Sequence, residues 1–221
     1  MNIHNLERTT SLLDIFTSEL RDINVQRDSM RFRKNLERVG ELLAYELSKK
    51  LRYQSKVVTT PLGKKHTYCL QETVVICSVL RAGLTLHKGV LNYFDSAESA
   101  FISAYRKRDA KDEIEIIVNY AAAPSLEGKI LLLTDPMLAT GKTLENVLKV
   151  LRDYGNPKEI HILSAVGSQP GVDHVSKIFP SSTHLWIATI DAELNDRSYI
   201  IPGLGDAGDL AYGEKLKIKT N

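Results

Sequence analysis

Short apolar runs alternate with helical stretches along most of the chain, and this alternation limits the fold more than any other feature. Within each run, apolar residues would point to both faces of a strand, so both faces of the strand must be covered. Strands of this kind occur in parallel sheets that carry helices on both faces. The runs cover residues 74–79, 101–105, 130–134, 160–166 and 185–190. The pattern therefore predicts an α/β fold with a mostly parallel sheet flanked by helices.

The remaining elements are predicted from periodicity and turn residues. Residues 114–120 are predicted to form an edge strand, because acidic residues interleave with their apolar ones. Residues 56–70 carry β-branched side chains around Pro61-Leu62-Gly63, which predicts a hairpin. Residues 1–28 are predicted to be a short lead-in and turn. Helices are predicted over residues 29–52 (with Ser29 as N-cap), 84–94, 141–154 and 172–179.

Composition narrows the class of protein. Apolar residues make up 43% of the 221-residue chain, so we expect one domain over residues 1–221 that folds without disulfides. The net charge of +2 is too small to suggest a nucleic-acid coat or a membrane-surface protein. There is no apolar run of signal-peptide or membrane-span length, and the two cysteines are expected to be free thiols. We therefore expect a cytoplasmic protein without nucleic-acid or membrane partners.

The strongest motif covers residues 130–148, where a buried strand ends at Asp135 and a loop of small and hydroxylated residues leads to Gly141 and a helix. In open α/β sheets, ligands bind beyond the carboxyl ends of strands. Backbone amides at a helix N-terminus suit a phosphate, whereas a carboxylate suits a pair of sugar hydroxyls. A phosphate beside a diol indicates a ribose phosphate. A plain strand-to-helix turn would explain Asp135 as a cap, but not the whole loop.

The second motif covers residues 198–213, called the C-terminal loop below. It contains four glycines without a regular period, and glycine permits close backbone approach to a ligand. The apolar residues Ile200, Ile201, Pro202 and Leu204 favour an ordered loop over a flexible one. Its backbone N–H and C=O groups are suited to the carbonyl and N–H groups of uracil. Cytosine would place a donor against a donor, and such a mismatch discriminates strongly.

Two arginines also follow predicted strands. Arg81 lies in the segment Leu80-Arg81-Ala82-Gly83, and Arg106 follows Tyr105. The planar guanidinium suits pyrophosphate oxygens, although a single arginine is weak evidence because surface arginines are common. The six histidines show no ligand or nucleophile spacing, so each is expected to be exposed or packed. Cys77 and Trp186 are expected to lie in the core.

At these motifs the sequence resembles the uracil phosphoribosyltransferase family. The phosphoribosyl pyrophosphate motif is matched by residues 135–141 and the uracil loop by residues 199–209, while residues 80–84 and 32–46 also match family segments in the right order. The resemblance implies a type I phosphoribosyltransferase fold with a small hood and a β-arm, which would be the hairpin at 56–70. It implies the reaction of uracil with phosphoribosyl pyrophosphate to give UMP and pyrophosphate, as in pyrimidine salvage. It also implies Mg²⁺ bound through the substrate pyrophosphate, and a homodimer or higher homo-oligomer.

The resemblance also assigns roles by motif position. Arg81 and Arg106 would hold the pyrophosphate and, with Asp135, act in catalysis, and Asp206 would also contact phosphoribosyl pyrophosphate. Residues 135–143, called the phosphate loop below, would hold the ribose 5-phosphate. They are Asp135, Pro136, Met137, Leu138, Ala139, Thr140, Gly141, Lys142 and Thr143. Uracil would be held by Ile200, Gly205, Asp206 and Ala207.

The chain departs from the family pattern in three places. Lys142 stands where many members have a second glycine, and it would either contact a phosphate or point to solvent. Residues 107–126, the expected position of a loop over the active site, match the pattern poorly. Leu210 and Tyr212 replace a basic residue and a Phe. Whether a nucleotide such as GTP acts as an effector stays open at this point.

Two alternative functions, from other classes of protein, stay open. A P-loop nucleotide kinase is suggested by Gly141-Lys142-Thr143 and by the apolar run ending at Asp191. However, the first glycine of that motif would fall at Pro136, which cannot donate an N–H. An RNA-binding regulator on the same fold is disfavoured by the balanced charge and by the lack of a basic stripe with aromatics.

Overall fold

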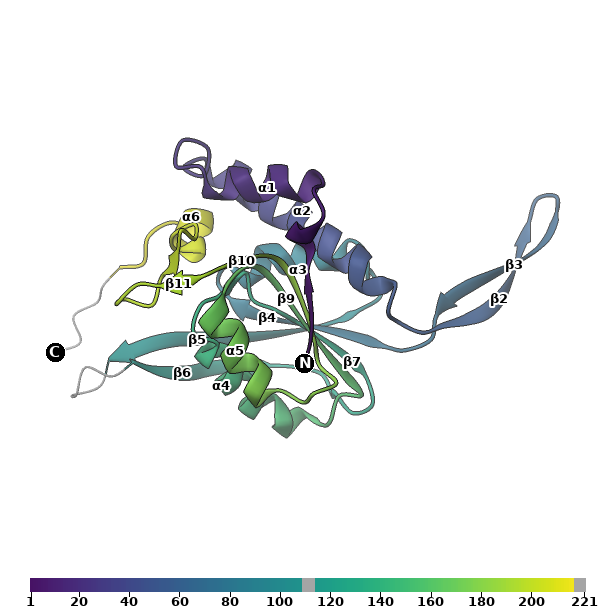
Figure 1. Ribbon diagram of the computed structural model, residues 1–221. Coiled ribbons are helices and arrows are strands. Elements are labelled where there is room, and N and C mark those ends of the chain that lie inside the picture. Colours follow the sequence, from purple (N-terminus) through teal and green to yellow (C-terminus); the bar gives the residue numbers. More distant parts are fainter. Residues whose placement is uncertain (109–113, 217–221) are drawn as a thin grey trace.

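The computed structural model describes residues 1–108 and 114–216, and the side chains of 105–117 lie outside the description (Figure 1). Its centre is a sheet with the strand order β1-β10-β9-β7-β4-β5-β6, in which β8 also pairs with β9. All pairings are parallel except that of β5 with β6 at one edge. The strands are β1 (Asn2–Asn5), β4 (Val74–Leu80), β5 (Glu98–Arg108), β6 (Ile114–Ala122), β7 (Ile130–Thr134), β8 (Met137–Leu138), β9 (Glu159–Ser168) and β10 (His184–Asp191).

Helices and two small sheets complete the described structure. The antiparallel pairs are the hairpin β2 (Tyr53–Thr60) with β3 (Gly63–Leu70), and β11 (Glu193–Leu194) with β12 (Ile200–Ile201). Figure 1 shows the hairpin projecting away from the sheet. The helices are α1 (Leu12–Arg21), α2 (Ser29–Ser48), α3 (Gly83–Leu91), α4 (Lys142–Leu151), α5 (Gln169–Ile178) and α6 (Ala207–Tyr212), with 3₁₀ turns at Leu6–Arg8 and Arg152–Tyr154.

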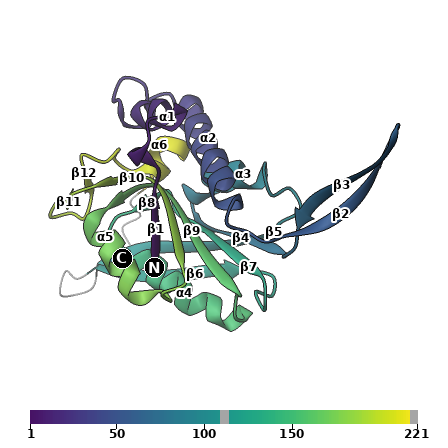
Figure 2. The same ribbon diagram turned by 45° about the vertical axis from the view of Figure 1, so that its right-hand side comes forward.

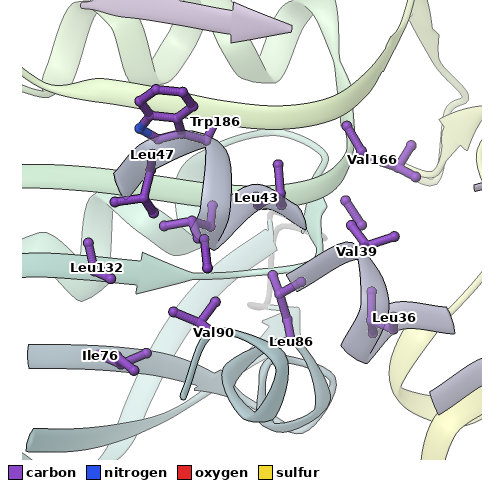
Figure 3. Close-up of a cluster of buried hydrophobic side chains, with 14 of the residues drawn as sticks. Leu36, Val39, Leu43, Leu47, Ile76, Leu86, Val90, Leu132, Val166 and Trp186 are labelled. Carbon is purple, nitrogen blue, oxygen red and sulfur yellow. The ribbon is translucent and has the colours of Figure 1, made fainter. Parts of the chain in front are cut away.

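Alternate residues of the central strands enter two separate hydrophobic cores. On one face, Ile76 and Leu132 pack with α1, α2, α3 and the C-terminal segment, as the side chains in Figure 3 show for α2 and α3. On the other face, Val75 and Leu131 pack with α4 and α5. Side chains on both faces of these strands are therefore buried, as the apolar runs predicted. The predicted mostly parallel α/β sheet flanked by helices is confirmed.

Most predicted elements occur close to their expected positions. The hairpin, the antiparallel edge strand and the five apolar strands are all present, and β5 is longer than predicted at both ends. The first long helix ends at Ser48 rather than at residue 52. Its N-cap is Asp28, whose side chain accepts hydrogen bonds from Met30 N and Arg31 N, and not the predicted Ser29.

The prediction for residues 1–28 was wrong. They contain β1, which adds a parallel strand next to β10, and the ten-residue helix α1. Helix α1 begins with a capping box, in which Ser11 Oγ accepts from Leu13 N and Ser11 N donates to Asp14 at 2.7 Å. This signature is visible in the sequence. The helix was missed because its inner face is short and includes Thr17 beside Leu13 and Leu20.

No helix in the described part of the chain is both long enough and apolar enough to cross a membrane.

Helices α2 and α3 cross at two glycines. A Cβ added at Gly89 would lie 2.0 Å from the carbonyl oxygen of Glu37, and one added at Gly40 would lie 2.6 Å from that of Leu86. Backbone atoms cannot move aside as a flexible side chain can. The close approach of these helices therefore depends on glycine at both positions.

We expect Gly89→Ala to lower the free energy of unfolding by roughly 2–3 kcal/mol or more, because the added methyl group forces the two helices apart. Urea unfolding followed by circular dichroism would measure this change. Leu84→Ala, at a position of the same helix that is 43% exposed, is the matched control and should change stability by clearly less than Gly89→Ala. Equal effects of the two substitutions would contradict the packing argument.

Three histidines stack around Trp186 at the β1–β10–β9 side of the sheet. The His4 ring lies 3.8 Å from the indole ring centroid, and His184 lies 5.1 Å from His161. Trp186 Nε1 donates to His161 Nδ1 at 3.1 Å. Cys77 and Trp186 are both buried, as predicted, and His161 is a packed histidine. Burial lowers the pKa of His161 to about 4, and the nearby His184 adds to this effect.

The low pKa of His161 makes stability depend on pH. In the unfolded chain this group binds a proton below about pH 6.5, whereas the folded protein binds it only near pH 4. The unfolded state therefore binds more protons between these values, and stability falls as the pH drops through the window. We expect a loss of roughly 2 kcal/mol from this group at pH 5 relative to pH 7. His161→Gln should reduce the loss of stability measured by urea unfolding at the two pH values by about this amount, while His4, His87 and His184, whose pKa values burial also lowers, leave a remainder. An unchanged loss would contradict the assignment.

Candidate active site

The strand order reverses next to β4, and this places two strand ends side by side. The chain leaves β4 to form β5 on one side, and β7 later returns to the other side of β4. The carboxyl ends of β4 and β7 therefore flank a topological switch point, where open α/β sheets bind ligands. Arg81 follows β4 and Asp135 follows β7. The fold thus brings together two residues that the sequence had suggested separately.

A cavity of about 640 Å³ opens at this point. Its walls come from the end of β4, the middle of β5, the phosphate loop, the C-terminal loop and Lys215 beyond that loop. The lining residues are Val79, Leu80, Arg81, Ala82, Ser103, Ala104, Asp135, Met137, Ala139, Thr143, Ser198, Tyr199, Ile200, Gly205, Asp206, Ala207, Gly208 and Lys215. This volume suits a small-molecule ligand of more than one chemical part.

The phosphate loop forms a second, smaller hollow beside the main cavity. It is lined by Leu138, Thr140, Gly141 and Leu144, together with four residues that also line the main cavity. Gly141 caps α4 in the left-handed conformation with φ of 74°, and a Cβ there would lie 3.0 Å from atoms of His174 and Val175. Glycine is therefore required at this turn. The first amides of α4 follow directly and suit an anion.

Strand β9 and helix α5 hold the backbone of the phosphate loop. Pro136 O accepts from Ala165 N and Val166 N at 3.1 and 2.9 Å, and Ser168 Oγ donates to Ala139 O at 2.6 Å. A Cβ at Gly171 would lie 2.1 Å from Ala139 O, so α5 packs directly against the loop. The carbonyl groups of the loop are thus engaged on the side away from the cavity.

Arg81 extends from the end of β4 to the C-terminal segment. Its Nη2 lies 2.6 Å from Asp209 Oδ1 and 3.1 Å from Gly213 O, while its Nε is buried and has no hydrogen-bond partner among the residues that the structure describes. Lys215 Nζ lies 3.3 Å from Asp206 and 3.7 Å from Asp209. Two cations and two carboxylates therefore face one another at the rim of the cavity.

Asp206 is the N-cap of α6, where its Oδ1 accepts from Asp209 N at 3.0 Å. Burial alone would raise the pKa of Asp206, but the hydrogen bond from Asp209 N–H and the charge of Lys215 together bring it below its ordinary value. Asp206 is consequently a carboxylate at neutral pH. It accepts hydrogen bonds and attracts cations at the cavity.

The C-terminal loop packs against the rest of the protein through some of its apolar residues, whereas Ile201 and Pro202 are exposed. Ile200, Leu204 and Ala207 are buried, and the loop joins the core that contains α1 and α2. The last third of the segment is the short helix α6, which the sequence analysis did not predict. Arg33 of α2 donates to Ala211 O at 2.7 Å, and Figure 2 shows α6 beside α1 and α2.

Most of the predicted site residues lie around these two hollows. The exceptions are Pro136, whose carbonyl faces β9, and Lys142, which is exposed at the start of α4 and lines neither hollow in the described structure. Strand β5 includes the backbone of Arg106, but its side chain lies outside the description. Those that line a hollow are Arg81, Asp135, Met137, Leu138, Ala139, Thr140, Gly141, Thr143, Ile200, Gly205, Asp206 and Ala207.

Sequence reasoning missed several lining residues. Ser103 and Ala104 lie in the middle of β5, where it passes the carboxyl end of β4 and where its pairing with β6 shifts register. Strand position was a usable signal for both. Tyr199 and Gly208 lie within the second motif but were not assigned roles. Lys215 lines the cavity from the C-terminal segment, and nothing in its local sequence marks it.

Comparison with known proteins gives concordant matches. A sequence model of the uracil phosphoribosyltransferase family matches residues 8–214. The uracil phosphoribosyltransferase of Porphyromonas gingivalis is 50% identical over 216 residues, covering 98% of this chain and 100% of that protein. The one from Thermococcus gammatolerans is 38% identical over 97% of this chain and 95% of that protein. Among solved structures, the AQ2163 protein from Aquifex aeolicus matches with a TM-score of 0.85 and 32% identity, covering 96% of this chain and 98% of that one.

Proposed function

The chain belongs to the uracil phosphoribosyltransferase family, and we propose that the cavity at the ends of β4 and β7 is where its reaction takes place. The enzyme transfers the phosphoribosyl group of phosphoribosyl pyrophosphate to uracil, giving UMP and pyrophosphate. One observation carries the proposed location. A single cavity is lined by the phosphate loop on one side and by the C-terminal loop on the other, so two substrates can meet in it.

The phosphate loop would hold the ribose 5-phosphate. The amides at the start of α4 and the hydroxyl groups of Thr140 and Thr143 lie around the smaller hollow. The helix dipole contributes only about 0.3–1 kcal/mol, so hydrogen bonds must provide most of the affinity. Asp135, at the boundary of the two hollows, would accept hydrogen bonds from the ribose hydroxyls.

The C-terminal loop would hold uracil against the reacting carbon. Ile200 offers an apolar surface, and the backbone around Gly205, Asp206 and Ala207 offers N–H and C=O groups to the edge of the base. Gly205 has φ of 93°, a conformation that favours glycine and lets the backbone face the cavity. Such backbone groups would distinguish the carbonyl at C4 of uracil from the amino group of cytosine.

Arg81 and Arg106 would stabilise the pyrophosphate. In the described structure Arg81 is paired with Asp209, so pyrophosphate would take the place of that carboxylate as partner of the guanidinium. No group of three or more His, Cys, Asp or Glu side chains in the described part of the chain could hold a metal ion. Mg²⁺ would therefore enter on the pyrophosphate, where it would reduce the charge of the leaving group.

The proposed chemistry follows from these positions. The bond from ribose C1 to the pyrophosphate oxygen breaks and its electron pair leaves with pyrophosphate, while the ribose ring gains oxocarbenium character. Uracil N1 then bonds to C1 and loses its proton. Arg81 and Arg106 would stabilise the charge that develops on the leaving group. Holding both substrates face to face provides a large part of the acceleration. We assign no general base.

The proposal also includes an oligomeric state and a location in the cell. The hairpin β2–β3, which extends away from the sheet, would act as an arm in a homodimer or higher homo-oligomer (Figure 1). A salvage enzyme of this kind would act in the cytoplasm. Sedimentation would establish the oligomeric state, and GTP added to the turnover assay would show whether a nucleotide effector changes the rate.

We expect Arg81→Ala to weaken phosphoribosyl pyrophosphate binding or turnover by roughly 1.5–3 kcal/mol, the contribution of a hydrogen bond to a charged group. Steady-state kinetics with both substrates varied would measure this effect. Arg33→Ala is a matched control for phosphoribosyl pyrophosphate binding alone, because Arg33 also donates to a backbone carbonyl near the C-terminus, that of Ala211, but does not line the cavity. Unchanged kinetics in Arg81→Ala would remove Arg81 from the proposed site.

We also expect the enzyme with phosphoribosyl pyrophosphate and Mg²⁺ to form UMP from uracil, with kcat/KM for cytosine lower by roughly 10³-fold or more, because cytosine places a donor against a donor. Nucleotide and pyrophosphate release would be followed with a panel of bases. Comparable use of cytosine would contradict the backbone recognition of uracil. ATP-dependent formation of UMP from uridine would instead favour the kinase alternative.

A further inference from the structure

We propose that Arg21 and Asp191 are positioning residues that set the conformation of the C-terminal loop and thereby the recognition of uracil. This inference rests on the proposed role of that loop in holding the base. Asp191 ends β10, and the sequence suggested it as a residue at a strand end, where ligands bind, and as part of a kinase-like strand. Arg21 is the last residue of α1, a helix that the sequence analysis did not predict.

The two side chains hold both backbone groups of one residue in the loop. Arg21 pairs with Asp191 through two hydrogen bonds, Nη1 to Oδ2 at 2.8 Å and Nη2 to Oδ1 at 2.9 Å. Gly203 N donates to Asp191 Oδ2 at 3.0 Å, and Arg21 Nη1 donates to Gly203 O at 3.1 Å. The ion pair therefore clamps the peptide groups on either side of Gly203.

Gly203 lies at the turn that sets the spacing of the cavity wall. Ile200 and Gly205, on either side of it in sequence, both line the cavity. Gly203 has φ of 56°, and a Cβ there would lie 2.2 Å from Ile200 O. The turn is tight, and only glycine fits it. A displacement of Gly203 would consequently move both Ile200 and Gly205.

Further hydrogen bonds to Thr189 and Glu7 hold the Arg21–Asp191 pair in place. Arg21 Nη2 donates to Thr189 Oγ1 at 3.2 Å, and the Thr189 hydroxyl donates to Glu7. Glu7 also accepts from Ile190 N at 3.3 Å. The side chains of Arg21 and Asp191 are only 22% and 10% exposed, so solvent screens their interaction less than it screens a surface ion pair. The clamp is thus a fixed part of the fold rather than a mobile surface contact.

Neither side chain lines the cavity, so the two residues act through the loop and not on the substrate. Recognition of uracil by backbone N–H and C=O groups requires those groups to stay in place. Loss of the Arg21–Asp191 pair should therefore weaken uracil binding and reduce the selectivity for uracil over cytosine. Binding of phosphoribosyl pyrophosphate, which depends mainly on the phosphate loop held by β9, should change little.

Kinetics of Arg21→Ala and Asp191→Asn would test this proposal in the full-length enzyme. We expect the KM for uracil to rise roughly tenfold or more, the preference for uracil over cytosine to fall, and the KM for phosphoribosyl pyrophosphate to stay within about twofold. Arg21→Lys should restore part of the uracil affinity. An unchanged uracil KM, or an equal rise of both KM values, would overturn the proposal.

Glu19→Ala is the matched control for a loosened α1. Glu19 accepts from Asn35 of α2 at 2.6 Å and pairs with Arg31, but it does not contact the C-terminal loop. This variant should lower the melting temperature without changing the uracil KM. If the uracil KM rises as much in Glu19→Ala as in Arg21→Ala, the effect comes from lower stability of the protein. That result would overturn the proposed positioning role of the Arg21–Asp191 pair. Should Arg21→Ala not fold, Arg21→Lys and Asp191→Asn carry the same comparison.

Ala207→Val separates this inference from the proposed base site. Ala207 lines the cavity, so the larger side chain should raise the uracil KM if the base binds there. A uracil KM unchanged by Ala207→Val would contradict the proposed base site itself. A raised KM in Ala207→Val with no change in the two clamp variants would contradict the clamp alone.

Discussion

The burial of the central strands on both faces is the constraint on which the rest of the structure depends. Because Val75 and Ile76 enter different cores, helices must cover both sides of the sheet, and the covered central strands run parallel, while β5 and β6 pair antiparallel at one edge. Parallel strands end at the same edge, which is the one place where polar side chains from separate segments can gather. The reversal of strand order beside β4 opens that edge between Arg81 and Asp135. The cavity is therefore a consequence of the hydrophobic pattern before any particular side chain is considered.

Two separate sets of contacts hold the two halves of the cavity. The phosphate loop is fixed by its neighbours in the sheet, since Pro136 O and Ala139 O are engaged by β9 residues. The C-terminal loop contains the two-residue strand β12 and the short helix α6, and side chains of other elements fix it at α6 through Arg33 and at Gly203 through the Arg21–Asp191 pair. The turn at Gly203 lies between β12 and α6, so its backbone groups need such partners. The half proposed for phosphate is held by the sheet, whereas the half proposed for the base is held by side chains.

This division also explains what could be predicted from the sequence. The strands, the phosphate loop and Asp135 were predictable, because apolar runs and a strand-to-helix turn leave local signals. Helix α1 had a local signal in its capping box, but its short inner face concealed it. The contact of Arg21 with Asp191 spans 170 residues, and no local pattern could indicate it. Lys215 is brought to the cavity by the same long-range folding of the C-terminal segment. Motifs therefore located the candidate site, while the side chains that hold the half proposed for the base became apparent only in the structure.

The charges at the cavity rim have a consequence for how a polyanion could enter. Arg81 and Lys215 are each paired with a carboxylate of the C-terminal segment, so their charges are already balanced in the described structure. If pyrophosphate binds Arg81 as proposed, it must displace Asp209, and the freed carboxylate then needs another partner. A cation that arrives with the pyrophosphate would reduce the resulting repulsion. The same displacement would change the contacts of α6, whose N-cap is Asp206 and which is contiguous with the base half of the cavity. Binding of pyrophosphate would in this way alter the contacts around the position proposed for uracil, because the short helix α6 contributes contacts to both positions.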